Sequence, residues 1–276
     1  MVNTVPGIKL NNGIMMPQFG LGVFKAKEGE EVEGAVAVAL EAGYRAIDTA
    51  AVYGNEEGVG RAIAASGIPR QELFITTKLW NDDQGHDATL LAFNKSLDRL
   101  GMDYVDLYLI HWPKAEKGKY KDTWKAFEEL YASGKIRAIG VSNFKPPHLQ
   151  ELLKDAKVVP AVNQIELHPM MTQLATREYC EAKGIKIEAW SPLMRAGELL
   201  ENPLIIKVAG KYSKEPAQVV LRWHIQSGLI VIPKSVTPKR IQSNIDIFDF
   251  ELTSEEMEQI DRLNQDKRVG ADPDLF

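Results

Sequence analysis

The sequence Val105-Asp-Leu-Tyr-Leu-Ile-His111 is a mainly apolar run that ends on an ionisable side chain. The same pattern recurs at Tyr44-Arg-Ala-Ile-Asp48 and at Leu73-Phe-Ile-Thr-Thr-Lys78. Runs of this length between helix-like stretches are typical of buried parallel strands. The carboxyl ends of such strands lie at one edge of the sheet, where active sites are built. These three runs therefore predict a parallel sheet that gathers their final side chains at one edge.

Eight such runs alternate with helix-like segments along the chain. The expected strands are 19–22, 44–48, 73–78, 105–111, 136–141, 161–166, 185–190 and 229–232. The expected helices are 31–42, 56–66, 88–100, 121–133, 147–155, 173–183, 203–212, 216–226, 238–244 and 254–263. This alternation predicts an α/β fold, a (β/α)8 TIM barrel with two additional helices, formed by one domain over residues 1–276. Asn12-Gly13 between short apolar segments predicts an N-terminal β-hairpin with a two-residue turn.

A doubly wound open sheet is the alternative fold for the same alternation. That fold needs a glycine-rich fingerprint after an early strand. Gly20-Leu-Gly22 and Gly58-Val-Gly60 lack the third glycine and the required setting. The barrel is therefore favoured.

The bulk composition is that of an ordinary globular protein, with 45% hydrophobic and 26% charged residues in a chain of 276. The single cysteine, Cys180, rules out an intrachain disulfide, which fits a reducing compartment. The N-terminus has no signal-peptide pattern, and no apolar run approaches the roughly 18–20 residues that span a bilayer. The net charge is −5 and no dense basic stripe is present. We expect a cytoplasmic monomer that binds neither membrane nor nucleic acid.

The polar strand ends suit the reduction of a carbonyl group, which needs a hydride at carbon and a proton at oxygen. Tyr53 lies just beyond Asp48, and a free phenol has a pKa near 10. An ammonium about 4 Å away would lower this pKa towards neutrality, and Lys78 can supply it. Asp48 would hold Lys78 charged, while uncharged His111 would orient the carbonyl oxygen. The group predicts a carbonyl reductase in which Tyr53 is the proton donor.

Each of these residues also has a purely structural explanation. Asp48 and Lys78 could form an ion pair, a loop tyrosine usually packs, and a strand-end histidine is often a satisfied hydrogen-bonding residue. The coincidence of all four on neighbouring strands favours the catalytic interpretation.

Several long stretches resemble the aldo-keto reductase family. They are GYRAIDTAAVYGNEEGVGRAI, LFITTKLW, MDYVDLYLIHWP, KIRAIGVSNF and IPKSVTPKRIQSN. The resemblance extends from the first hairpin to the C-terminal tail. It is nearest to the microbial branch of 2,5-diketo-D-gluconate reductases and glyoxal or methylglyoxal reductases. The family's catalytic tetrad falls on Asp48, Tyr53, Lys78 and His111, the four residues that the chemistry indicates.

Further strand ends suit the nicotinamide of a cofactor. Ser142, Asn143 and Gln164 can donate and accept hydrogen bonds as a carboxamide requires. Trp190 offers a flat face for the ring, although a tryptophan alone is more often part of a core. The resemblance implies that an aromatic residue at this position stacks on the nicotinamide.

The sequence Ile232-Pro-Lys-Ser-Val-Thr-Pro-Lys-Arg240 predicts a phosphate site. Thr237 and Pro238 are typical of a helix start, and a helix N-terminus attracts phosphate. A solvated basic turn is the alternative. The resemblance implies that Arg240 binds the adenosine 2′-phosphate, which favours NADPH over NADH. It also implies that Asn244 contacts the adenine. Many relatives carry a glutamate just before that asparagine, where this chain has Ser243, and this departure bears on the adenine contact and not on the cofactor class. The expected cofactor-binding residues are Ser142, Asn143, Gln164, Trp190, Ser191, Leu193, Lys234, Ser235, Val236, Thr237, Arg240 and Asn244.

The substrate pocket is expected beside the reactive cluster. Phe24, Trp80 and Trp112 follow the first, third and fourth strands and would line an apolar pocket together with His111. Packing below the barrel mouth is the alternative explanation for these aromatics. The loops 113–120 and 194–201 and the tail from residue 264 are expected to set specificity. A small-molecule carbonyl, either a reactive aldehyde or a keto-sugar, is the expected substrate.

Two other functions fit a barrel. A zinc hydrolase would be expected to carry a His-x-His pair at the end of the first strand, and residues 19–22 have none, so no metal site is expected. A non-catalytic NADPH-binding sensor would keep the phosphate site but could lose the proton-transfer residues. The presence of all four favours the enzyme.

Overall fold

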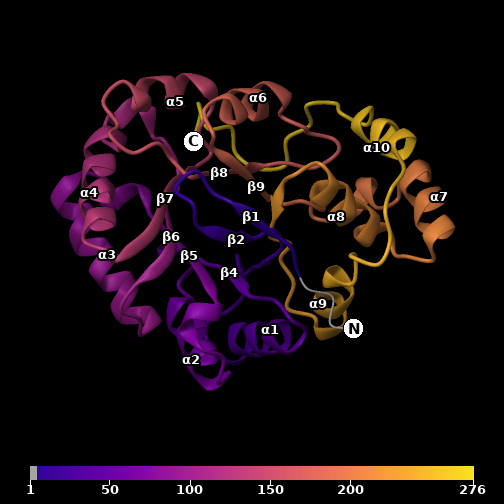
Figure 1. The fold of residues 1–276 in the computed structure, drawn as a ribbon, viewed down its shortest axis with the longest axis horizontal. Helices are drawn as coiled ribbons and strands as arrows, with labels where there is room; N and C mark the ends of the chain where they lie inside the picture. The colour runs from indigo at the N-terminus through magenta and orange to yellow at the C-terminus, as the bar shows by residue number, and fades with distance from the viewer. Residues whose placement is uncertain (1–4) are drawn as a thin grey trace.

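The computed structural model of the chain describes residues 5–276, and these form a barrel of eight parallel strands enclosed by helices (Figure 1). The strands follow one another around the barrel in chain order, from β3 to β10. They are β3 (Leu21–Gly22), β4 (Ala46–Asp48), β5 (Phe74–Leu79), β6 (Val105–Ile110), β7 (Ile136–Ser142), β8 (Val162–Glu166), β9 (Lys186–Trp190) and β10 (Ile230–Val231). The predicted (β/α)8 fold is confirmed.

Glycines allow the first and last strands to approach closely and close the barrel. The backbone N–H of Gly20 donates to the carbonyl oxygen of Val231 over 3.0 Å, and Gly22 forms a parallel bridge with Lys234. A Cβ on Gly22 would lie 2.9 Å from the carbonyl oxygen of Ile232. Closure through such isolated bridges explains why β3 and β10 are shorter than the sequence predicts.

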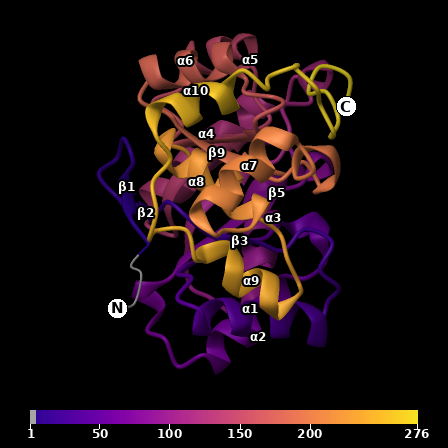
Figure 2. The ribbon, with the colours of Figure 1, turned by 90° about the vertical axis from the view of Figure 1, so that its right-hand side faces the viewer.

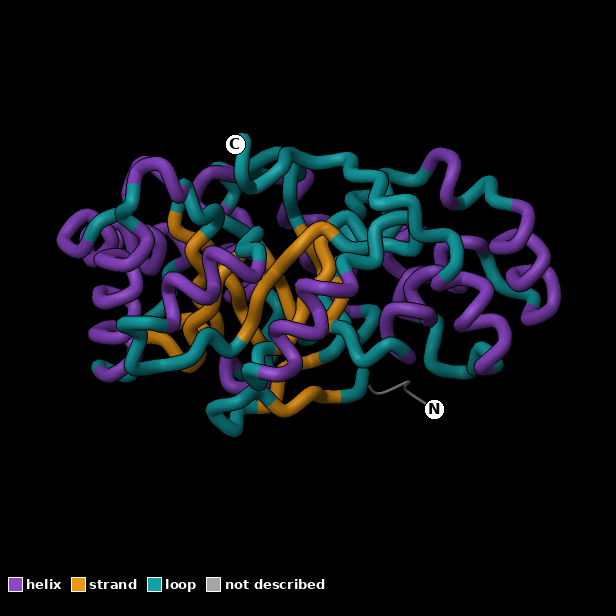
Figure 3. Tube along the Cα trace, turned by 90° about the horizontal axis from the view of Figure 1, so that it is seen from above, coloured by secondary structure: helices purple, strands orange, loops and turns teal. Residues whose placement is uncertain are grey.

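Helices surround the strands, as the view from above shows (Figure 3). Buried side chains of the strands pack against the inner faces of these helices and form the main core. The two additional helices are present, because two helices separate β9 from β10 and another follows the eighth barrel helix. The helices are α1 (Glu30–Glu41), α2 (Glu56–Ala65), α3 (His86–Leu100), α4 (Tyr120–Ala132), α5 (Pro146–Leu153), α6 (Leu174–Ala182), α7 (Pro203–Tyr212), α8 (Pro216–Gln226), α9 (Pro238–Ile245) and α10 (Ser254–Asp261).

The N-terminal hairpin closes the end of the barrel at which the strands begin. Strands β1 (Gly7–Lys9) and β2 (Met15–Pro17) pair in antiparallel fashion. Leu10 and Met16 are buried against the first residues of several barrel strands, including Phe74 of β5. The hairpin and the C-terminal tail lie on opposite sides of the molecule (Figure 2). The barrel mouth therefore faces the tail.

The hairpin turn differs from the predicted two-residue turn. The N–H of Leu10 donates to the carbonyl oxygen of Ile14 over 2.8 Å, and the N–H of Gly13 donates back to Leu10 over 3.0 Å. The loop therefore contains three residues, Asn11–Gly13, and Gly13 takes the positive φ of 89° that closes such a loop. The Asn12-Gly13 pair predicted the hairpin correctly, but its turn also includes Asn11.

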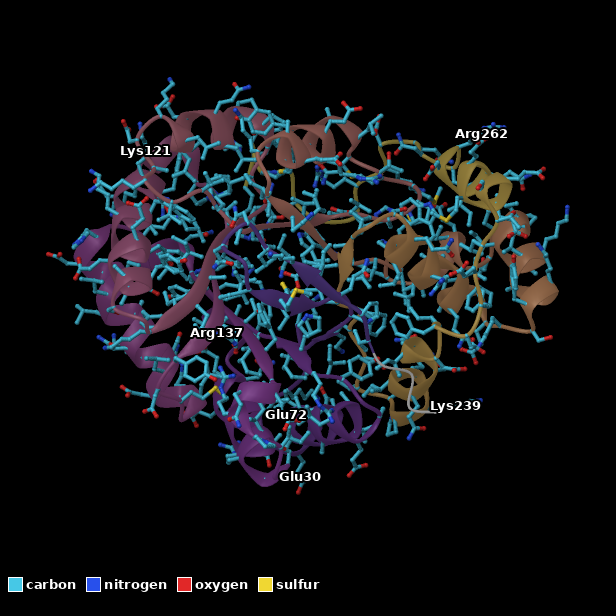
Figure 4. All side chains as sticks on the ribbon, in the orientation of Figure 1. Glu30, Glu72, Lys121, Arg137, Lys239 and Arg262 are labelled. Carbon is cyan, nitrogen blue, oxygen red and sulfur yellow. The ribbon has the colours of Figure 1, made fainter. Side chains whose placement is uncertain are left out.

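Charged side chains lie mostly outside the barrel. Lys121, Lys239 and Arg262 project from helices at the periphery of Figure 4. Within residues 5–276, no helix is both long enough and apolar enough to span a lipid bilayer.

Candidate functional site

A cavity of about 910 Å³ opens at the carboxyl ends of the strands, on the side of the tail. Every residue that the sequence predicts for the site lines this cavity, except Lys78. Lys78 lies beneath the cavity floor with a fully buried side chain. The structure thus brings the predicted catalytic, cofactor and substrate residues to one place.

The floor of the cavity is built around the ammonium of Lys78. Lys78 Nζ donates to Asp48 Oδ1 over 2.6 Å and to the carbonyl oxygen of Thr49 over 2.8 Å. It also lies 3.4 Å from the hydroxyl of Tyr53. Tyr53 ends a single 3-10 turn, η1 (Ala51–Tyr53), that follows β4, and this turn places its ring over the end of the neighbouring strand β5. One cation therefore contacts both an acid and a phenol.

Burial and mutual contact set the charges of this group. Burial by itself lowers the pKa of Lys78, but the nearby Asp48 carboxylate and Tyr53 outweigh it and raise that pKa. Burial raises the pKa of Asp48, while Lys78 opposes the change. Burial, together with the positive charge of Lys78, holds the pKa of His111 well below its usual range. His111 is therefore an uncharged imidazole at neutral pH, as the sequence analysis expects.

The expectation that Lys78 brings the pKa of Tyr53 towards neutrality is wrong. Burial raises the pKa of Tyr53 above its usual value of 10. Lys78 lowers it, but Asp48 and Glu188 add negative charge that works in the opposite direction. The prediction included the effect of the Lys78 ammonium on the pKa but not the desolvation of the phenol. Desolvation has the larger effect on the pKa here. Tyr53 is a protonated phenol at neutral pH.

The amide side chains predicted to bind the nicotinamide are mostly engaged with other groups of the protein. Asn143 Nδ2 donates to the carbonyl oxygen of His111 over 2.9 Å, and the indole N–H of Trp190 donates to Asn143 Oδ1 over 2.9 Å. Ser142 Oγ donates to the carbonyl oxygen of Gln164 over 2.8 Å. These bonds fix the Trp190 ring at the cavity wall.

The sequence analysis missed Glu188, a buried acid on β9 beneath the cavity. Gln164 Nε2 donates to Asp48 Oδ2 over 2.8 Å and to Glu188 Oε2 over 2.7 Å. Burial and the charge of Asp48 raise the pKa of Glu188 to about 8, so its carboxyl is mainly protonated at neutral pH. Alternation along a strand could have revealed it, because Glu188 and Trp190 share a face.

The predicted phosphate site lies at the start of α9. Thr237 is the N-cap residue and Pro238 is the first helical residue, as predicted, but the Thr237 side chain makes no capping hydrogen bond. Lys234 and Arg240 are exposed, and neither has an ion-pair partner within the described chain. Unpaired cations beside an open helix N-terminus suit a phosphate.

The other end of the phosphate site also contains an unpredicted acid. Ser243 Oγ donates to Glu215 over 3.4 Å, and Glu215 lines the cavity together with Asn244. A carboxylate from the start of α8 thus lies next to Ser243.

The predicted pocket aromatics Phe24, Trp80 and Trp112 also line the cavity. The rings of Phe24 and Tyr53 lie 5.0 Å apart, and those of Trp80 and His111 lie 5.3 Å apart. Phe276 of the tail packs 4.4 Å from the ring of Trp112. Half of the Phe24 surface is exposed, so packing does not account for it fully.

The tail is held over the cavity by Glu166, at the end of β8. The buried carboxylate accepts hydrogen bonds from the backbone N–H groups of Val269 over 2.6 Å and Gly270 over 3.0 Å. A Cβ on Gly270 would clash with the ring of Trp190, so the tail fits there only through glycine. The sequence analysis assigned the tail to specificity but did not identify this anchor.

The loop after β9 follows the cavity wall with an unusual backbone. Ser191, Met194, Arg195 and Ala196 all have a positive φ although none is glycine. Such conformations are costly for residues with a side chain and occur often at ligand-binding segments. Ser191 and Leu193, the predicted cofactor contacts, both line the cavity.

The model of the Aldo/keto reductase family matches residues 16–265. The chain belongs to the aldo-keto reductase family. It is 59% identical to glyoxal reductase of Bacillus subtilis (strain 168), an alignment that covers 97% of this chain and 96% of that relative. It is 51% identical to methylglyoxal reductase DkgA of Escherichia coli (strain K12), over 98% and 97% of the two chains. The resemblance that the sequence predicts is therefore confirmed.

A solved structure with the same fold contains NADPH. The crystal structure of a Gox0644 mutant in complex with NADPH superposes with a TM-score of 0.94 at 47% identity and covers 98% of each chain. This likeness agrees with the barrel described above.

Proposed function

We propose that this enzyme reduces small aldehydes or ketones to alcohols with NADPH, and that Tyr53 donates the proton. The observation that carries the proposal is the group of Tyr53, Lys78, Asp48 and His111 at the floor of one cavity. As a carbonyl oxygen gains negative charge, an uncharged imidazole can donate a hydrogen bond to it and a protonated phenol can donate a proton. A buried cation stabilises the negative charge that results.

The cofactor of the enzyme is NADPH, and the residues at the cavity wall fit it. Trp190 has a ring fixed at the wall, Gln164 presents an amide, and Lys234 and Arg240 are unpaired cations at the start of α9. Arg240 can form a bidentate hydrogen-bonded contact with the 2′-phosphate of NADPH, a group that NADH lacks. When bound, NADPH supplies the hydride for the carbonyl carbon.

The raised pKa of Tyr53 gives Lys78 a different role from the one that the sequence predicts. The phenol stays protonated until the carbonyl oxygen becomes strongly basic, and it then donates its proton. The ammonium of Lys78, 3.4 Å from the hydroxyl, stabilises the phenolate that remains. His111 orients the oxygen by donating a hydrogen bond.

The substrates that we propose are small reactive carbonyls such as glyoxal and methylglyoxal. The names of the two similar reductases support this class. The aromatic walls and the tail residue Phe276 leave a pocket suited to small molecules, although a keto-sugar is a second candidate. We further propose that the enzyme is a cytoplasmic monomer that binds no nucleic acid, in line with its net charge of −5.

The test of the proton donor is Tyr53→Phe, which keeps the ring packed against Phe24 and removes the hydroxyl. We expect kcat to fall about 10²–10⁴-fold, measured as loss of NADPH absorbance with glyoxal, methylglyoxal, aromatic aldehydes and keto-sugars. NADPH binding, followed by quenching of tryptophan fluorescence, should stay near wild type. Tyr104→Phe, at the opposite end of β6 from His111, is the matched control.

Two outcomes would contradict the proposal. Undiminished turnover of Tyr53→Phe would remove Tyr53 from the reaction. A wild-type protein that binds NADPH but reduces no carbonyl of the panel would instead favour the non-catalytic sensor.

A further inference from the structure

Glu188 belongs to the buried group beneath the cavity, although no step of the proposed reaction uses it. Its side chain is 1% exposed, and it lies on β9 two residues before Trp190. Its Oε2 accepts from Gln164, while its Oε1 has no hydrogen-bond partner in residues 5–276. An acid in this position is costly to bury, so its retention at the centre of the barrel calls for an explanation.

The side-chain amide of Gln164 has only one orientation that satisfies both neighbouring acids. Its NH2 group has two hydrogens, and these bind Asp48 and Glu188 over 2.8 and 2.7 Å. Both donors are then used, and only the carbonyl oxygen Oε1 is left for the cavity that Gln164 lines. Without Glu188, the amide would have one acid to bind, and its NH2 could turn towards the cavity.

The remaining amide of the site, that of Asn143, is already engaged by the protein at both its oxygen and its nitrogen. Asn143 Oδ1 already accepts from the indole of Trp190, and its Nδ2 donates to His111 and Ser142. The NH2 of a nicotinamide carboxamide needs an acceptor oxygen, and Gln164 Oε1 is the side-chain amide oxygen of this group that the described residues leave without a partner.

We propose that Glu188 is a positioning residue that fixes the Gln164 amide so that Gln164 Oε1 accepts a hydrogen bond from the carboxamide NH2 of the cofactor. The inference rests on the proposed function, because it takes the nicotinamide to lie between Trp190 and Gln164. Glu188 itself does not line the cavity and acts only through Gln164.

A binding experiment with two cofactors and two variants tests this. NADP⁺ carries the carboxamide NH2, whereas its 3-acetylpyridine analogue carries a methyl ketone there and is otherwise identical. Glu188→Met removes the acceptor at similar size, and Glu188→Gln retains a carbonyl oxygen that can accept. Dissociation constants are measured by isothermal titration calorimetry on the full chain, with melting curves to show that each variant is folded.

We expect Glu188→Met to weaken NADP⁺ binding about tenfold, as the loss of one well-placed hydrogen bond would, and to leave the analogue nearly unaffected. Glu188→Gln should bind both cofactors like the wild type. If the methionine variant does not fold, Glu188→Val, which is smaller, carries the same comparison.

Equal losses for NADP⁺ and the analogue would overturn the inference, because a general distortion of the barrel does not distinguish the two. Unchanged binding of both by the apolar variant would overturn it as well. Either result leaves the Tyr53 test intact. A wild-type protein that bound neither cofactor would overturn the proposed function, and the inference with it.

Discussion

Replacing Glu188 by glutamine should change how protein stability depends on pH. The pKa of Glu188 is about 8 in the folded protein against 4.5 for an ordinary glutamate, because burial and Asp48 disfavour its charged form. Between these values the folded state keeps a proton that the unfolded state loses. The unfolding free energy of the wild type therefore falls as pH rises from 4.5 to 8, and this contribution is constant outside that window.

The size of the effect follows from the width of the window. Each pH unit in which the proton is held only by the folded state changes the unfolding free energy by about 1.4 kcal/mol. Glu188→Gln has no such proton. Its unfolding free energy relative to wild type should therefore increase by roughly 4 kcal/mol between pH 5 and pH 8.

The assay is urea unfolding at pH 5, 6, 7 and 8, followed by tryptophan fluorescence and compared at equal m-values. Glu256→Gln is the matched control, because Lys211 and the start of α10 hold the Glu256 carboxylate and lower its pKa to about 2. Its difference from wild type should be flat over this range, since both states are ionised throughout. A Glu188→Gln difference that also stays flat, within about 1 kcal/mol, would refute the reasoning.

Three further changes test other parts of the structure. Gly270→Ala places a methyl group against the Trp190 ring and should displace the tail. The KM for carbonyl substrates should then rise several-fold with little change in melting temperature. An unchanged KM would show that the tail does not shape the site. Arg240→Ala should raise KM for NADPH at least tenfold more than KM for NADH, and equal effects would argue against a 2′-phosphate contact. Asn202→Ala removes the cap whose side chain accepts from the N–H of Leu204 and should lower the unfolding free energy by about 1 kcal/mol without changing kcat, as urea unfolding would show.

The sequence predicted the barrel because its strand signals are local. Runs such as 105–111 are apolar, short and bounded by helix-like stretches, and the polar residue at each end marks the mouth. The shortness of β3 and β10 escaped prediction, because it depends on how the closing strands meet through Gly20 and Gly22. That meeting involves segments far apart in the chain. The assignment of residues 1–276 to one domain stays a prediction.

The composition of the site was predictable, but its electrostatics were not. Residue types at strand ends located Tyr53, Lys78 and His111, yet the pKa of Tyr53 depends on desolvation and on every charge nearby. Glu188 adds negative charge near Tyr53 and was missed, although alternation along β9 places it on the same face as Trp190; its contact with Gln164 depends on the neighbouring strand β8. The contact of Glu166 with Gly270 joins positions too distant in the sequence for any short-range signal.

Strands β1 and β2 cover the end of the barrel at which the strands begin, and the described cavity opens at the other end. Leu10 and Met16 are buried at this covered end, while the cavity next to Tyr53 is lined by the tail residues Gly270, Ala271 and Phe276. In the proposed reaction, the Tyr53 hydroxyl that gives up its proton in one turnover would regain it through the cavity by which the alcohol leaves. Release of the alcohol and reprotonation of Tyr53 would thus share one route, and slow release of the alcohol would delay both.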